Sequence, residues 1–269
     1  MVVQHNMQAA NTNRMLGQNV KAVAKSTEKL SSGYAVNRAA DDAAGLSISE
    51  KMRNQIRGIN QAVKNAEDGV SLIQTAEGNM NEIHNVLQRM GELATKAAND
   101  VNASEDRTAI SNEMSELASE ISSIAAKAAF NGTKLLDGAF DKQLQVGAVA
   151  GENMQITIAG MGADTLGVGD LGVASHASAS DAMSLITSAI KQVSSARSLL
   201  GAKQNRLEYT INNLENYSEN LTSAESQIRD TDMASEMTSY TKNSILQQAA
   251  QSMLAQANQS TQGVLSLLQ

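Results

Sequence analysis

The sequence predicts a mainly α-helical protein, built as a long antiparallel helical bundle or coiled coil with a small central β-hairpin region and paired N- and C-terminal helices. The 269-residue chain contains no Pro, which favours long helices because Pro breaks a helix interior. Apolar residues recur seven apart in both halves of the chain, the spacing of helices that pack in coiled coils. Gly residues and β-like segments gather between the halves, in residues 141–180.

The first helix is expected at about residues 3–32. Ser31-Ser32-Gly33 predicts its end, because Gly frees the backbone and Ser competes for its hydrogen bonds. A short polar connector should follow at residues 37–45. The apolar residues of this helix fall seven apart and are interpreted as a polymerisation seam: Val2, Ala9, Leu16, Val23 and Leu30.

A second helix is expected to continue to Ala98-Asn99, and its length of about 50 residues corresponds to roughly 75 Å. Ser104 is the predicted N-cap of a third helix. Asn131-Gly132 and Asp137-Gly138 predict turns. Beyond them, residues 144–146 and 155–158 are expected to form short strands, joined through residues 147–151.

The second half repeats the helical pattern. From Ile186 to Ile228 an apolar residue falls at every seventh position, and Lys203 is the one charged residue in the companion seam. Residues 229–232 are polar and predict an interruption before a final helix. That helix carries the second predicted polymerisation seam: Leu246, Ala250, Met253, Leu254, Ala257, Val264 and Leu267. Two terminal helices cannot bury both apolar stripes fully, so we expect part of each stripe to contact other subunits.

Composition argues against several classes of function. The chain has no Cys, which excludes disulfides and Cys-ligated zinc, and its three His residues are dispersed. No phosphate-binding loop or nucleophilic Ser motif occurs. The carboxylate pairs Asp41-Asp42 and Asp230/Asp232 could bind cations or act as acid and base, but helix caps and connector polarity are the favoured interpretation. We therefore predict a protein that is not an enzyme and holds no cofactor or metal.

The net charge of −7 comes from interspersed residues of both signs, so nucleic acid is not an expected partner. No run of 18 apolar residues occurs, and no membrane span is predicted. Residues 1–7 have neither a basic segment nor an apolar segment of a secretory signal. If the protein leaves the cell, we expect it to use another route.

Two long segments carry a family resemblance. LSSGYAVNRAADDAAGLSISEKMR at residues 30–53 resembles the N-terminal region of bacterial flagellins, and ILQQAAQSMLAQAN at residues 245–258, with VLSLL at 264–268, resembles their C-terminal region. Residues 205–207 and 220–224 match the intervening helix. The resemblance implies inner-tube parts at 1–40 and 235–269, rod-domain helices at 41–140 and 181–234, and a short β-rich segment at 141–180 in place of variable outer domains.

The resemblance also implies a function and partners. The chain is expected to polymerise with itself into the bacterial flagellar filament for swimming motility. It would be extracellular, exported by the flagellar type III pathway without a cleaved signal peptide. Implied partners are an export chaperone, hook-associated and cap proteins, and Toll-like receptor 5. The residues that match the family's receptor-binding motif are Leu87, Gln88, Arg89, Leu93 and Glu113.

Three alternatives stand beside this interpretation. A hook–filament junction protein of the same superfamily would cap a filament rather than extend it, and the long match at residues 245–268 argues against it. A signalling helical hairpin would need a membrane segment or a helical tip where the β-like centre lies. An enzyme has no supporting constellation of residues.

Overall fold

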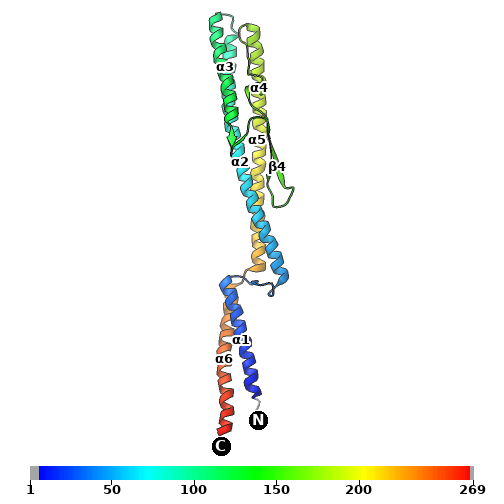
Figure 1. Cartoon of the computed structure of the whole chain (residues 1–269), viewed down its shortest axis with the longest axis vertical. Helices are drawn as coiled ribbons and strands as arrows, with labels where there is room; N and C mark the ends of the chain where they lie inside the picture. Colours follow the sequence, from blue (N-terminus) through cyan, green and yellow to red (C-terminus); the bar gives the residue numbers. More distant parts are fainter. Residues whose placement is uncertain (1–5, 267–269) are drawn as a thin grey trace. The chain divides into compact units, whose positions relative to one another are not determined.

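The computed structural model describes residues 6–266, with side chains through residue 260. The chain divides into two compact units: unit 1 comprises Met1–Ile56 and Glu219–Gln269, and unit 2 comprises Arg57–Ser218. The mainly α-helical fold class is confirmed (Figure 1). In chain order the elements are α1 (Met7–Ser32), α2 (Ala43–Ala97), α3 (Ser104–Lys127), β1 (Ala129–Phe130), β2 (Thr133–Lys134), β3 (Phe140–Gln145), β4 (Asn153–Ile158), α4 (Ala163–Leu166), α5 (His176–Arg229) and α6 (Met233–Ser266).

Local hydrogen bonds explain where α1 begins and where it ends. The side-chain oxygen of Asn6 accepts a hydrogen bond from the amide of Ala9 at 2.9 Å, which caps the first turn. At the other end Gly33 has a φ of 76°, and its amide donates to the carbonyl of Lys29 at 2.8 Å. Such a left-handed residue closes a helix at little cost only when it is Gly. The predicted break at Ser31-Ser32-Gly33 is confirmed.

The two polar connectors of unit 1 pair with each other. The amide of Ala35 donates to the carbonyl of Arg229 at 2.7 Å, and the amide of Thr231 donates to the carbonyl of Gly33 at 3.0 Å. Tyr34 and Asp230 form an isolated antiparallel bridge between them. The predicted interruptions are confirmed, and their mutual hydrogen bonds hold the end of α1 beside the end of α5.

As predicted, carboxylates of the two Asp pairs cap the helices that follow these connectors. Asp42 accepts from the amides of Ala44 and Gly45 at 3.0 Å each, at the start of α2. Asp232 accepts from the amide of Ala234 at 2.9 Å, at the start of α6. Each carboxylate thus satisfies amides that a first helical turn leaves unpaired and also matches the positive end of the helix dipole.

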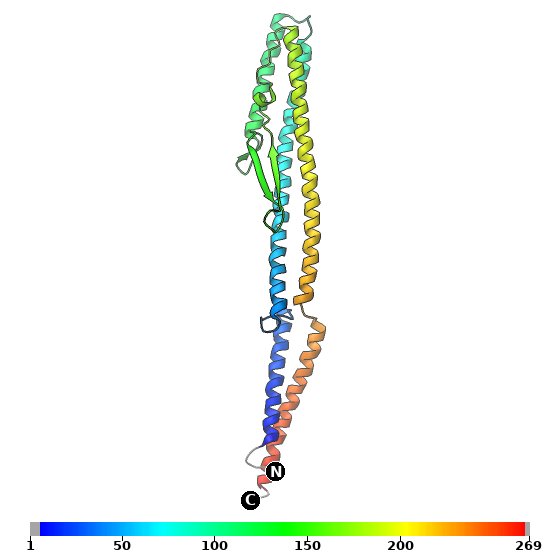
Figure 2. The same ribbon diagram turned by 90° about the vertical axis from the view of Figure 1, so that its right-hand side faces the viewer.

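In unit 2, α2, α3 and α5 run side by side (Figures 1 and 2). Their facing sides form one hydrophobic core, which also takes in the β3–β4 hairpin and α4. Ile73, Met80 and Leu87 of α2 are fully buried in it. The heptad positions Ile186, Val193, Leu200 and Leu207 of α5 are buried there too. Lys203, the charged residue of the companion seam, donates from Nζ to the carbonyl of Gln155 at 3.0 Å and so ties α5 to β4.

The predicted hairpin is present and longer than expected. Strands β3 and β4 pair antiparallel from Phe140 opposite Ile158 to Gln145 opposite Asn153. Alternate residues of β4 are buried, as expected for a strand with one face on the core. The hairpin lies along α2, where a methyl group on Gly69 would overlap the side chain of Leu144. Gly69 therefore permits the close approach of the hairpin to the helix.

Several local features differ from the sequence-based expectation. The N-cap of α3 is Ala103, and the prediction of Ser104 is wrong. The Asp106 carboxylate performs the capping instead, because it accepts from the amide of Ala103 at 3.2 Å. The small β1–β2 hairpin lies before the predicted β-rich segment, with its turn at Asn131-Gly132. The one-turn helix α4 was not predicted, and α5 begins at His176 rather than near residue 181.

Candidate assembly and recognition surfaces

The terminal helices α1 and α6 lie side by side in unit 1 (Figures 1 and 2). Ala9, Leu16, Val23 and Leu30 of the predicted α1 seam are half-buried. On α6, Ala250 and Leu254 are half-buried and Ala257 is buried. Next to the first turn of α1, the Asn6 side-chain amide donates to the carbonyl of Ala257 at 3.1 Å.

This pairing buries little. Among the described side chains of unit 1, only two apolar residues, Val36 and Ala257, are buried. Unit 2 buries a continuous core along all its helices. Unit 2 therefore has a buried core of its own, and apolar burial is the main stabilising term in folding. In the α1–α6 pair, large apolar side chains such as Ile245 and Met253 remain exposed.

The residues of the predicted α6 seam are unequally exposed. Leu246 and Met253 are 43% and 52% exposed. Val2, Leu267 and the side chain of Val264 lie outside the described residues. Six exposed residues of α6 are spaced four apart, and we name this row the outer ridge: Met233, Met237, Thr241, Ile245, Ala249 and Met253.

The outer ridge has the geometry of a helix-packing surface. Rows of residues spaced four apart form the ridges that fit into the grooves of a second helix. Ile245 is 60% exposed at its middle and Met237 is 50% exposed. The two residues line a shallow groove of about 420 Å³ together with Thr238, Thr241 and Lys242. Sequence reasoning missed this row because the seven-residue pattern dominated, although the four-residue spacing could have revealed it.

A cluster of charges fixes the connectors of unit 1. Arg229 donates from Nη1 to the Glu50 carboxylate at 3.0 Å, and its guanidinium lies 4.5 Å from the centre of the Tyr34 ring. Lys25 Nζ lies 2.8 Å from the Asp41 carboxylate. The hydrogen bond from Lys25, together with one from the amide of Arg38, lowers the pKa of Asp41 from 3.8 to about 2.

The lowered pKa of Asp41 predicts an acid-sensitive contribution to the stability of unit 1. In the folded chain this carboxylate stays charged to a lower pH than in the unfolded chain, so the contribution is full above about pH 4 and is lost as pH falls towards 2. We expect Asp41→Asn to lower the denaturant midpoint near neutral pH, and the difference from the unchanged chain to vanish near pH 2. Circular dichroism across this range measures it.

Lys25→Met provides the second arm of this test. It removes the first cause of the lowered pKa and should reproduce the pH profile of Asp41→Asn. A difference between Asp41→Asn and the unchanged chain that stays constant down to pH 2 would contradict the assignment.

Of the predicted receptor-binding residues in unit 2, some are buried and others are exposed. Leu87 is fully buried and Leu93 is 3% exposed, so both pack in the core. Gln88, Arg89 and Glu113 are exposed. Arg89 donates from Nη2 to Glu113 at 2.9 Å and from Nη1 to Glu92 at 3.0 Å. Its hydrogen bond to Glu113 is the main cause that raises the Arg89 pKa, and the ion pairs orient the guanidinium over a polar groove of about 530 Å³ between α2 and α3.

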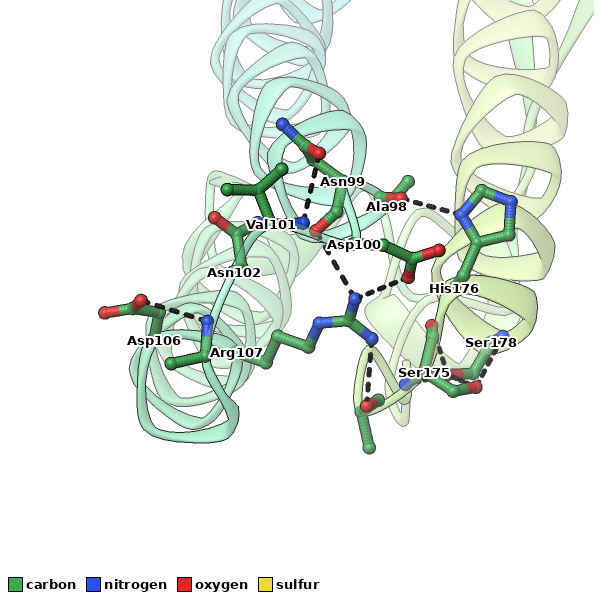
Figure 3. Close-up of polar contacts among 12 residues, drawn as sticks. Ala98, Asn99, Asp100, Val101, Asn102, Asp106, Arg107, Ser175, His176 and Ser178 are labelled. Carbon is green, nitrogen blue, oxygen red and sulfur yellow. Dashed lines mark hydrogen bonds and ion pairs between the residues drawn. The ribbon is translucent and has the colours of Figure 1, made fainter.

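A polar clasp closes the end of unit 2 where α2 turns into α3 (Figure 3). The Arg107 guanidinium donates to Asp100 at 2.9 Å and to the carbonyl of Ala174 at 3.3 Å. His176 donates from Nδ1 to the carbonyl of Ala98 at 2.7 Å, since a carbonyl can only accept. The clasp joins the α2–α3 turn to the start of α5, and no motif in the sequence indicated that Arg107 and residue 174 would meet.

Neither a metal site nor a membrane helix emerges from the part of the chain that the structure describes. No three His, Asp or Glu residues come together there in a way that could hold a metal ion. Among residues 6–266, no helix combines the length and the apolar character needed to cross a membrane.

Two family descriptions match most of the chain. The bacterial flagellin N-terminal helical region matches residues 3–141, and the C-terminal helical region matches residues 183–268. The chain is 51% identical over 271 residues to the flagellin of Halalkalibacterium halodurans and 49% identical over 303 residues to that of Bacillus subtilis. It is 45% identical over 286 residues to the flagellar filament 31.3 kDa core protein of Treponema maltophilum. Each alignment covers 100% of both chains.

Solved structures agree with these sequence matches. The crystal structure of Bacillus cereus flagellin has a TM-score of 0.51 and 30% identity, covering 56% of this chain and 88% of that one. A Vibrio parahaemolyticus structure named for a flagellar hook-associated protein has a TM-score of 0.60, covering 71% and 100%. Its identity is 13%, so it supports the fold alone.

Proposed function

The chain belongs to the bacterial flagellin family, and on that premise we propose that it assembles through α1 and α6 into the flagellar filament that drives swimming. It is a structural filament subunit and not an enzyme. The observation that carries the proposal is the outer ridge, an exposed and mainly apolar row on α6. In the filament, this ridge packs against other copies of the chain.

The proposal assigns a place to each part of the sequence. Residues 1–40 and 235–269 form the inner tube, which contains both seams. Residues 41–140 and 181–234 form the surrounding rod, and residues 141–180 stand where longer relatives carry outer domains. The thin core of unit 1 supports this arrangement, because helices that bury little within one subunit gain stability by packing between subunits.

Seeded polymerisation tests the proposed function. Purified full-length chain added to short filament fragments should extend them, and electron microscopy measures the length gained. A hook–filament junction protein would bind the fragment ends and stop further growth. Fragments that neither lengthen nor become capped would contradict assembly by this chain.

We also propose that the chain reaches the filament through the flagellar type III export channel, without a cleaved signal peptide. An export chaperone would cover the C-terminal helices beforehand, and hook-associated and cap proteins would contact the assembled polymer. The exposed outer ridge supports the need for a chaperone, since free apolar helices associate prematurely.

Co-purification with the cognate chaperone should be lost when residues 236–269 are deleted. Retention after deletion would place the chaperone site elsewhere.

Recognition by Toll-like receptor 5 is proposed for the exposed residues Gln88, Arg89 and Glu113. The ion pairs support it, because they hold Arg89 in one orientation before binding and so reduce the entropy lost in a complex. Leu87 and Leu93 would act indirectly by holding the helices in position.

Substitution of Arg89 tests this proposal. An Arg at the centre of an interface contributes about 2 kcal/mol or more, so Arg89→Ala should weaken binding to the receptor ectodomain at least about tenfold in surface plasmon resonance. Arg206→Ala removes another exposed Arg of unit 2 and serves as the matched control. Equal affinities of the two variants would contradict the assignment.

A further inference from the structure

The methionine side chains of the two units differ in how far they are exposed to solvent. Of those that the structure describes, the exposed ones all lie on α1 and α6: Met7, Met15, Met233, Met237 and Met253, between 48% and 75% exposed. Those in the core of unit 2 are at most 7% exposed: Met80, Met90, Met114, Met154 and Met161. Met52 and Met183 are half-buried, and Met1 lies outside the described residues.

This separation has a chemical consequence. A thioether in solvent reacts with a peroxide: the sulfur lone pair attacks one peroxide oxygen, the S–O bond forms, the O–O bond breaks, and water leaves after proton transfer. Sulfur loses two electrons and the peroxide gains them. The product, methionine sulfoxide, is polar and is returned to the thioether by sulfoxide reductases. A methionine in the core of unit 2 is shielded from this attack.

From this distribution we propose that the five exposed methionines are oxidation sites at which a peroxide arrests assembly of the free subunit and leaves unit 2 folded. The proposal rests on the assembly function proposed above. Met237 and Met253 flank Ile245 on the outer ridge, so a sulfoxide there introduces a polar S–O group into the apolar surface that a second copy would cover.

The size of the effect follows from burial of that group. A sulfoxide oxygen covered by another subunit without a hydrogen-bond donor is expected to weaken the contact roughly tenfold. Before oxidation, methionine side chains are well suited to such a contact, because their flexible thioethers fit irregular gaps. Polymerisation would also cover these sulfurs, so the polymer should resist the oxidant that modifies the free subunit.

Peptide mapping tests the chemical part of the proposal. Full-length free chain and polymer are treated with hydrogen peroxide, and mass spectrometry follows sulfoxide formation at each Met, Met1 included. In the free chain, the five exposed sites should oxidise at least about tenfold faster than the buried sites of unit 2, in line with their accessibility. In the polymer, their rates should fall. Uniform rates along the free chain would overturn the proposal.

Seeded extension tests the consequence. Peroxide-treated chain should extend filament fragments at least about tenfold more slowly than untreated chain, and sulfoxide reductase should restore the rate. A variant with all five sites changed from Met to Leu is compared with its own untreated rate, and peroxide should leave that rate unchanged, since Leu has similar volume and no sulfur. The control variant Met52→Leu/Met183→Leu should remain sensitive.

The outcomes separate this inference from the assembly function. Untreated chain that fails to extend fragments would contradict assembly itself. Untreated and oxidised chains that extend fragments equally well would overturn the oxidation proposal alone. Sensitivity that persists in the five-Leu variant would also overturn it, because the responsible sites would then lie elsewhere.

Discussion

Replacing Ile245 by Asp should stop filament extension while the subunit stays folded. Ile245 is 60% exposed at the middle of the outer ridge. A charge buried without a partner costs about 3–5 kcal/mol, which raises the concentration needed for assembly more than about 100-fold. In the free subunit the new carboxylate remains in solvent, so stability should change by less than about 0.5 kcal/mol.

Gln251→Asp is the matched control for this variant. Gln251 is also exposed on α6, but it does not belong to the outer ridge. Extension of fragments, followed by light scattering and electron microscopy, should be near normal for Gln251→Asp and absent for Ile245→Asp. Thermal unfolding followed by circular dichroism should be the same for both. If Ile245→Asp extends fragments normally, the outer ridge is not an assembly surface.

Leu87→Ala should destabilise unit 2 by about 3 kcal/mol, because it removes a fully buried side chain and leaves a cavity in the core. For a domain of this size the loss corresponds to a fall in melting temperature of roughly 6–12 °C. Arg89→Ala, two residues further along α2, removes only exposed ion pairs and should cost less than about 1 kcal/mol. Differential scanning calorimetry measures both changes.

The same pair of variants separates structural from contact roles in receptor recognition. At a temperature where Leu87→Ala is still folded, it should bind the receptor with nearly unchanged affinity, whereas Arg89→Ala should bind weakly although it is stable. If Leu87→Ala melts like the unchanged chain, the assignment of Leu87 to the core is wrong. If the folded Leu87→Ala chain loses receptor binding outright, a purely indirect role for Leu87 is contradicted.

The sequence by itself determined the class of fold and the positions of the helices. The absence of Pro and the seven-residue repeats predicted long helices, and the observed α1, α2 and α3 end or begin close to the expected residues. Such features are local: Gly33 ends α1 through its own backbone angle, and Asp42 caps α2 through amides two and three residues away. The family resemblance, now confirmed, rested on two long segments that require no knowledge of packing.

Only the tertiary structure decided which neighbour each apolar face meets. A repeat of apolar residues predicts that a helix has a partner, but it has the same form whether that partner lies in the same chain or in another. The sequence therefore joined Leu246 and Leu254 in one seam, whereas in the structure Leu254 is half-buried and Leu246 is 43% exposed. Leu87 and Arg89 also belong to one sequence motif, but the structure buries Leu87 in the core and exposes Arg89 at the surface. The clasp of Arg107 on residue 174 has the same cause, since contacts between distant residues depend on how the whole chain packs.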